Sequence, residues 1–98
     1  NAIIRACETV DNCLKKVVDC LIELDYSVII IADHGNADKL KNKDGSPHTA
    51  HTVNLVPVIV LDQHVKAVKN GKLADIAPSI LKLMEIDKPK EMSGDSII

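Results

Sequence analysis

The sequence has no phenylalanine and no tryptophan, and Tyr26 is its only tyrosine. Any core must therefore be aliphatic, and a hydrophobic fraction of 46% is large enough to build one. No apolar run reaches the 18 residues that a membrane-spanning helix needs. No secretory signal precedes the first charged residues either, so we expect a soluble, cytoplasmic protein.

A strong excess of charge of one sign is also absent. The net charge of −2 argues against a nucleic-acid-binding surface, which is typically basic. The three cysteines are odd in number and contain no Cys-x-x-Cys pair, so we expect reduced thiols rather than a disulfide framework. With 98 residues, the chain is one small domain or a piece of a larger one.

Periodicity predicts two helices and two strands in an α/β arrangement. Apolar residues spaced three and four apart predict an amphipathic helix over residues 2–24, which would cover one face of a sheet. Continuous aliphatic runs at 28–32 and 57–61 predict strands buried on both faces. Asp75 is predicted to cap the N-terminus of a second helix that reaches Met84.

Residues 33–55, between the two strands, show no usable periodicity. A segment of this length without regular structure is more often functional than not. Its three lysines, in contrast, are predicted to be a solvent-exposed loop tip; they are Lys39, Lys41 and Lys43.

Two polar clusters flank this segment. Asp33-His34-Gly35 follows the first strand directly, and His48 and His51 precede the second. Asp-His-Gly alone fits a capped turn beside an exposed histidine as well as it fits a metal site. Together, the carboxylate and imidazoles favour a divalent-metal site. Because only residues 52–56 separate His51 from the second strand, one shared site requires the two strands to run in opposite directions.

Five segments, in this order, resemble the C-terminal part of the cofactor-independent (2,3-bisphosphoglycerate-independent) phosphoglycerate mutases, which belong to the alkaline phosphatase superfamily. They are ADHGNAD at 32–38, HTAHT at 48–52, VPV at 56–58, LADIAP at 73–78 and EMSG at 91–94. Asp-His-Gly alone would fit other members of the superfamily, including phosphopentomutase. The HTAHT and EMSG segments favour the mutase.

The resemblance implies that residues 1–98 form the C-terminal part of a metal-binding, phosphatase-like domain, within a three-layer αβα sandwich that has a mixed sheet. It implies an isomerase of glycolysis that interconverts 3-phosphoglycerate and 2-phosphoglycerate through a phosphoserine, with two divalent metals, commonly manganese. Asp33 and His34 match the pair on the metal that holds the serine, and His51 matches a histidine on the other metal. For His48 the resemblance gives no ligand role, and we expect it to lie outside the ligand set.

The chain also departs from the family pattern. None of its serines matches the nucleophile motif, and the family's phosphate-gripping residues are missing, so no catalytic residue is assigned. We therefore expect an inactive fragment of a monomeric parent enzyme, with incomplete or absent metal and exposed surfaces that favour self-association. Two alternatives stay open: a fragment of a related enzyme such as phosphopentomutase, and a non-catalytic αβ module with incidental histidines.

Overall fold

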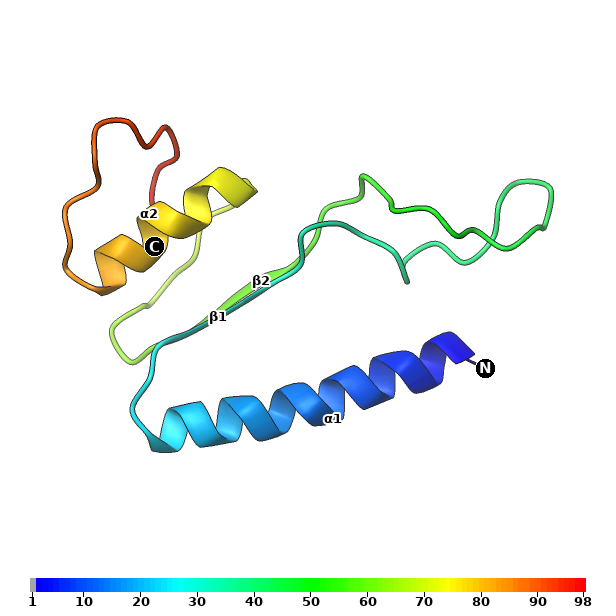
Figure 1. Ribbon diagram of the computed structural model, residues 1–98, viewed down its shortest axis with the longest axis horizontal. Coiled ribbons are helices and arrows are strands. Elements are labelled where there is room, and N and C mark those ends of the chain that lie inside the picture. The colour runs from blue at the N-terminus through cyan, green and yellow to red at the C-terminus, as the bar shows by residue number, and fades with distance from the viewer. Residues whose placement is uncertain (1) are drawn as a thin grey trace.

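A long helix, two short strands and a shorter helix make up the chain (Figure 1). The computed structural model describes residues 2–98, and the structural statements below refer to these. Helix α1 spans Ala2–Glu23, strand β1 Val28–Ile31 and strand β2 Val58–Leu61. Helix α2 spans Ile76–Leu83 and follows directly on one 3₁₀ turn, η1, at Leu73–Asp75. The predicted helices and strands are therefore confirmed, with small differences at their ends.

The two strands pair antiparallel. Val28 lies opposite Leu61 and Ile31 lies opposite Val58. The end of β1 therefore adjoins the start of β2, as a site shared by the flanking segments requires. The coarse α/β prediction is confirmed by these two strands and two helices.

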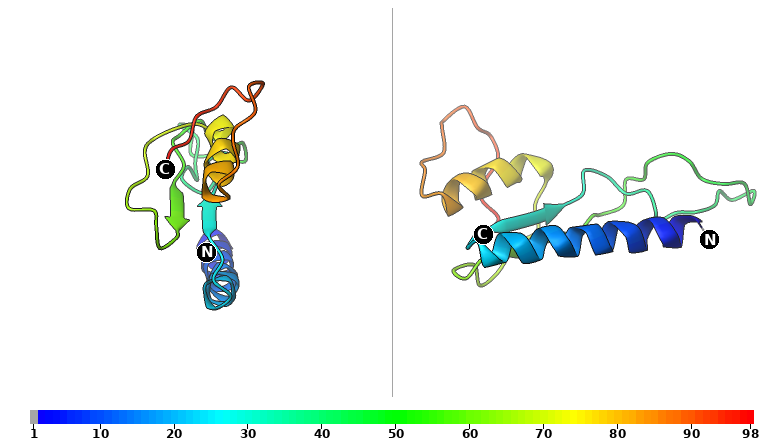
Figure 2. Two further views of the ribbon diagram at one scale, coloured as in Figure 1. Left: turned by 90° about the vertical axis from the view of Figure 1, so that its left-hand side faces the viewer. Right: turned by 60° about the horizontal axis from the view of Figure 1, so that its bottom comes forward.

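Helix α1 ends at a residue in the left-handed conformation, which reverses the chain into β1. Asp25 has φ 59°, and the Tyr26 amide donates to the Leu21 carbonyl at 2.9 Å. This pairing satisfies a carbonyl that the helix end would otherwise leave free. Helix α1 then lies on one side of β1 and α2 on the other, as Figure 2 shows. The half-buried residues of α1 share one stripe; they are Leu14, Val18 and Leu21.

The prediction that both strands are buried on both faces is wrong within this chain. Only Val28 of β1 is buried, while Ile31 is 43% and Ile59 is 47% exposed. A sheet of two strands has two open edges, and one helix on each side does not cover it. The radius of gyration, 16.5 Å, accordingly exceeds the value of about 13 Å expected for a compact domain of this size.

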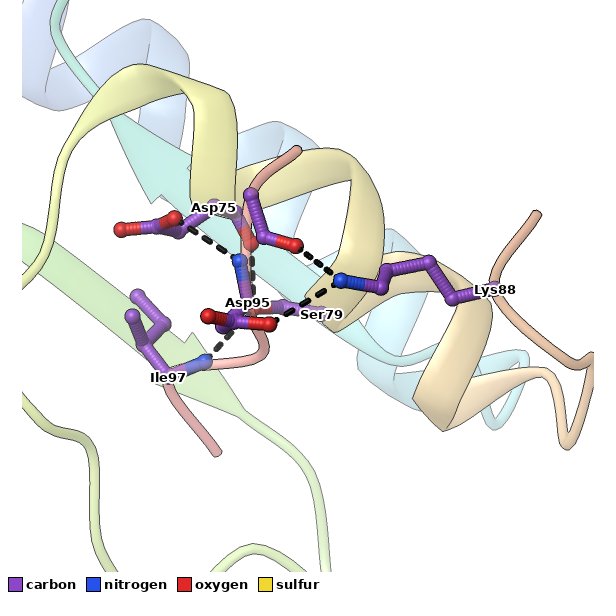
Figure 3. A network of polar contacts seen from close by, with 6 residues as sticks. Asp75, Ser79, Lys88, Asp95 and Ile97 are labelled. Carbon is purple, nitrogen blue, oxygen red and sulfur yellow. Dashed lines mark hydrogen bonds and ion pairs between the residues drawn. The ribbon is translucent and has the colours of Figure 1, made fainter. Parts of the chain in front are cut away.

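A polar network, rather than apolar burial, fixes the C-terminal segment against α2 (Figure 3). Asp75 occupies the predicted N-cap position of α2, but its side chain does not bond to that helix. Its carboxylate instead accepts hydrogen bonds from the backbone amides of Lys72 at 2.8 Å and Asp95 at 3.0 Å. Asp75 therefore ties the turn before η1 to a segment 20 residues further along the chain.

Ser79, which is 1% exposed, adds the next link of this network. Its hydroxyl donates to the Asp75 carbonyl at 2.7 Å and accepts from the Ile97 amide at 3.1 Å. Lys88 reaches across to the Gly94 carbonyl at 2.6 Å (Figure 3). Gly94 must be glycine here, because a Cβ atom would overlap the Ala74 carbonyl oxygen.

Three simpler predictions concern surface groups and membranes. The cysteines are unpaired and exposed, and the three lysines of the long loop are exposed. Over residues 2–98, no helix combines the length and apolar character needed to traverse a bilayer.

Replacing Ser79 by alanine should lower the free energy of unfolding by about 1–3 kcal/mol, because the buried Ile97 amide then loses its acceptor. Urea denaturation followed by circular dichroism measures this. Ser93→Ala, at an exposed serine of the same tail, is the matched control and should change stability by less than about 0.5 kcal/mol. Equal losses in the two variants would contradict the role assigned to Ser79.

Acid should weaken the hydrogen-bond network around Asp75. Hydrogen bonds from the Asp95 and Lys72 amides hold the pKa of Asp75 below its ordinary value. Its stabilisation is therefore complete above the unfolded pKa of about 3.9 and is lost as the pH falls through the lower folded pKa. We expect the urea midpoint to fall on acidification below about pH 4, and Asp75→Asn to flatten part of that fall. The control is Asp11→Asn on exposed α1; a pH dependence unchanged by Asp75→Asn would refute this prediction.

Candidate metal centre

The antiparallel register brings the two polar clusters to one end of the sheet. Beyond β1 the chain continues through Asp33 and His34, and the segment with His51 returns beside it toward β2. Gly35 and Thr52 form an isolated antiparallel bridge, and the Thr52 amide donates to the Gly35 carbonyl at 2.8 Å. One residue before each partner of this bridge stands a histidine.

Those two histidines are in contact. The rings of His34 and His51 stack with their centroids 3.4 Å apart and their planes 13° from parallel. The structure thus brings together the two segments that the sequence predicted to meet. Whether they bind a metal stays a prediction.

Asp33 lies near the Nε2 edge of the His34 ring. Its Oδ1 atom is 3.6 Å from Nε2 of His34, while Nδ1 of His34 is 3.1 Å from the Gly35 carbonyl oxygen. A carbonyl oxygen only accepts hydrogen bonds, so Nδ1 is the donor in this contact and Nε2 is the ring nitrogen that faces Asp33. A carboxylate oxygen and an imidazole nitrogen at this spacing are donors that a divalent cation accepts.

The Asp33–His34 distance is compatible with one shared cation. Ligand atoms each about 2.1 Å from a metal can lie at most about 4.2 Å apart, and 3.6 Å is within this limit. His51 differs, because the lone pairs of stacked rings lie in parallel planes and do not converge on one ion. Over residues 2–98, no three histidine, cysteine, aspartate or glutamate side chains form a group suited to a metal.

His48 lies outside the stack and is held by its own loop. Its Nδ1 atom is 2.8 Å from Oδ1 of Asn42, and its backbone amide donates to the Leu40 carbonyl at 3.0 Å. Nε2 of His48 is shielded from solvent and has no hydrogen-bond partner within residues 2–98. The expectation that His48 is not one of the metal ligands stays a prediction.

Sequence reasoning missed the residues that fix these loops. Asn42 orients His48, and Asp38 accepts hydrogen bonds from Thr52 and Asn54. Asp38 and Thr52 stand within the quoted motifs, but nothing in the motif letters says that they touch. Their only sequence signal is their nearness to His34 and His51.

Comparison with known proteins shows the family to which the chain belongs. Residues 1–88 match the model of the metalloenzyme superfamily. The chain is similar to three 2,3-bisphosphoglycerate-independent phosphoglycerate mutases: that of Flavobacterium johnsoniae (50% identity over 97 residues, 99% of this chain), that of Aster yellows witches'-broom phytoplasma (52% over 98 residues, 100%) and that of Salinibacter ruber (52% over 98 residues, 99%).

The chain spans about a fifth of the length of these relatives, since the match covers 19% of each. The family model, by contrast, matches most of the chain. The chain therefore belongs to the metalloenzyme superfamily.

Proposed function

We propose that this chain is the C-terminal part of the metal-binding domain of a cofactor-independent phosphoglycerate mutase. That enzyme interconverts 3-phosphoglycerate and 2-phosphoglycerate through a phosphoserine. The names of the similar proteins support the reaction. The contact between His34 and His51 is the structural observation that carries the proposal, because it joins the two motif segments in one place.

Within this proposal Asp33 and His34 hold the metal that also binds the nucleophilic serine, and His51 holds the second. The parallel rings support this division, since nitrogen lone pairs that lie in parallel planes do not converge on one ion. Oxygen and nitrogen donors suit manganese or zinc, and we propose manganese.

When bound, such a cation pair neutralises charge on the transferring phosphoryl group and favours the alkoxide of the serine. The part of this chain's residues is to hold the ligand side chains and to orient them. Nδ1 of His34 donates to the Gly35 carbonyl, so the ring keeps Nε2 aimed toward Asp33. A hydrogen bond from the ring nitrogen that does not bind the metal is the usual means of fixing a metal-binding histidine.

The same proposal implies that the chain packs against the rest of a larger domain. The open strand edges and the exposed apolar side chains of α1 suit a place within a larger three-layer αβα sandwich with a mixed sheet. We place the enzyme in the cytoplasm as a monomer acting on a small phosphoglycerate, with no nucleic-acid or membrane partner. Self-association of the isolated chain through these exposed surfaces stays a prediction.

Metal titration tests the ligand assignment. Asp33→Ala and His51→Ala should each weaken Mn²⁺ binding to the chain by at least about tenfold, because each removes a ligand atom; isothermal titration calorimetry measures this. His64→Ala, at an exposed histidine beyond β2, is the control and should bind as the wild type does. Unchanged affinity in both ligand variants would favour a non-catalytic module.

A chimera tests the reaction. Exchanging the matching C-terminal segment of the Flavobacterium johnsoniae enzyme for these 98 residues should retain mutase activity, because the two segments are 50% identical. His51→Ala in the chimera should lower kcat by about 100-fold or more, whereas the chain alone should show no turnover, since it has no nucleophile. A coupled assay with 3-phosphoglycerate measures all three. A chimera that folds but converts no phosphoglycerate would refute the proposal, and turnover by the chain alone would refute its dependence on the rest of the enzyme.

A further inference from the structure

One carboxylate connects the two histidine-bearing segments. Asp38 follows His34 by a few residues, and its Oδ2 atom accepts a hydrogen bond from the Thr52 hydroxyl at 2.8 Å. Oδ1 lies 3.1 Å from the same hydroxyl, and the Asn54 side-chain amide donates to Oδ2 as well. Both donors belong to the segment that follows His51, 14 and 16 residues from Asp38.

Gly35 allows the two segments to approach this closely. A Cβ atom at this position would overlap the Thr52 hydroxyl oxygen and would lie 2.7 Å from Oδ1 of Asp38. The backbone hydrogen bond from Thr52 to Gly35 lies at the same point. The hydroxyl of Thr52 is therefore enclosed between the Gly35 backbone and the Asp38 carboxylate.

The chemistry of Asp38 differs from that of an ordinary surface carboxylate. Hydrogen bonds from Asn54 first, and from Thr52 second, hold its pKa below the ordinary value. The carboxylate is thus a charged acceptor whose donors are neutral side chains of a distant segment, and hydrogen bonds to a charged acceptor are stronger than neutral ones.

Asp44, in the same loop, shows what a purely local role looks like. Its carboxylate accepts hydrogen bonds from the backbone amide and the hydroxyl of Ser46, at 3.0 and 2.6 Å, two residues away. Asp44 closes a turn, as aspartate commonly does. Asp38 carries the same charge and is also exposed, but its partners, Thr52 and Asn54, lie in the segment that follows His51.

We propose that Asp38 is a positioning residue of the metal centre, which clamps Thr52 and Asn54 so that His51 stays stacked on His34. This inference rests on the proposed function for its metal, but the clamp itself is a property of this chain. Without the carboxylate, the backbone bond between Thr52 and Gly35 is left to join the segments beside the histidines. The His51 ring then gains freedom, and the spacing of the two imidazoles is lost.

Nuclear magnetic resonance of the histidine rings tests the clamp without metal. In the wild-type chain, ring protons of His34 and His51 should show mutual nuclear Overhauser effects, since the centroids are 3.4 Å apart. Asp38→Ala should abolish these effects, whereas Asp44→Ala should retain them. Effects that persist in Asp38→Ala, or that vanish equally in Asp44→Ala, would overturn the proposal.

Metal affinity gives a second measurement, made on variants whose Val28–Leu61 contacts show that β1 and β2 are still paired. Asp38→Ala should weaken Mn²⁺ binding by about 10–100-fold, as loss of a residue that orients a ligand does, and Asp44→Ala should not. An Asp38→Ala chain that keeps wild-type affinity would overturn the positioning role. If the wild-type chain binds no Mn²⁺, the ligand assignment is not supported for the isolated chain, while the ring contacts still decide the clamp.

A milder variant covers the case in which Asp38→Ala unfolds the chain. Contacts between Val28 and Leu61 report on the β1–β2 pairing and should survive in every variant. Thr52→Val keeps the side-chain shape and removes only the hydroxyl that Asp38 accepts from, so it should reduce the His34–His51 ring contacts while leaving the strands paired. Ring contacts of wild-type strength in a folded Thr52→Val chain would overturn the clamp.

Discussion

The antiparallel register of β1 and β2 is the constraint on which the candidate site depends. Because Ile31 lies opposite Val58, the segment that follows β1 and the segment that precedes β2 lie at the same end of the sheet. The Gly35–Thr52 bridge carries this alignment onward and brings the His34 and His51 rings together. Since side chains alternate along a strand, a slip of one residue would turn every strand side chain to the other face, so the register specifies the site as well as the sheet.

In this chain charged hydrogen-bond acceptors hold distant segments together, which in larger domains is largely the effect of apolar burial. Val28, Pro78 and Ile97 are its buried apolar side chains among the described residues, a small core for the length. Asp75 and Asp38 are instead each the acceptor for donors from a distant segment, Asp95 for the first and Thr52 for the second. Both carboxylates have a lowered pKa for this reason. The tail and the long loop are therefore ordered by the same kind of contact.

The helices and strands could be predicted because periodicity is local: apolar spacing sets α1, and aliphatic runs set β1 and β2. Burial could not, because it depends on layers that a residue pattern does not contain, and Ile31 and Ile59 are consequently exposed. The meeting of the two histidine-bearing segments was predicted from their metal-binding residue types, and the opposite strand directions followed from that prediction and from the short connection between His51 and β2. The bond from Thr52 to Asp38 did not, because a hydrogen bond across 14 residues leaves no periodic signal. For Asp75 the cap position was right, but its carboxylate bonds to the amides of Lys72 and Asp95 instead of to α2.

The segment that the Asp75 network anchors reaches the end of the sheet where β1 ends and β2 begins. Ile97, which is 5% exposed, lines a cavity of about 220 Å³ together with Ile31 and Val58. The Ile97 amide is bound by Ser79 and its carbonyl by the Lys69 amide, so the network around Asp75 fixes the apolar group beside this strand end. The loop itself has little apolar burial, and its histidine-bearing segments are joined by polar contacts to Gly35 and Asp38. Any free energy that a cation contributes on binding there would then also be free energy of folding, as in other small metal-binding domains.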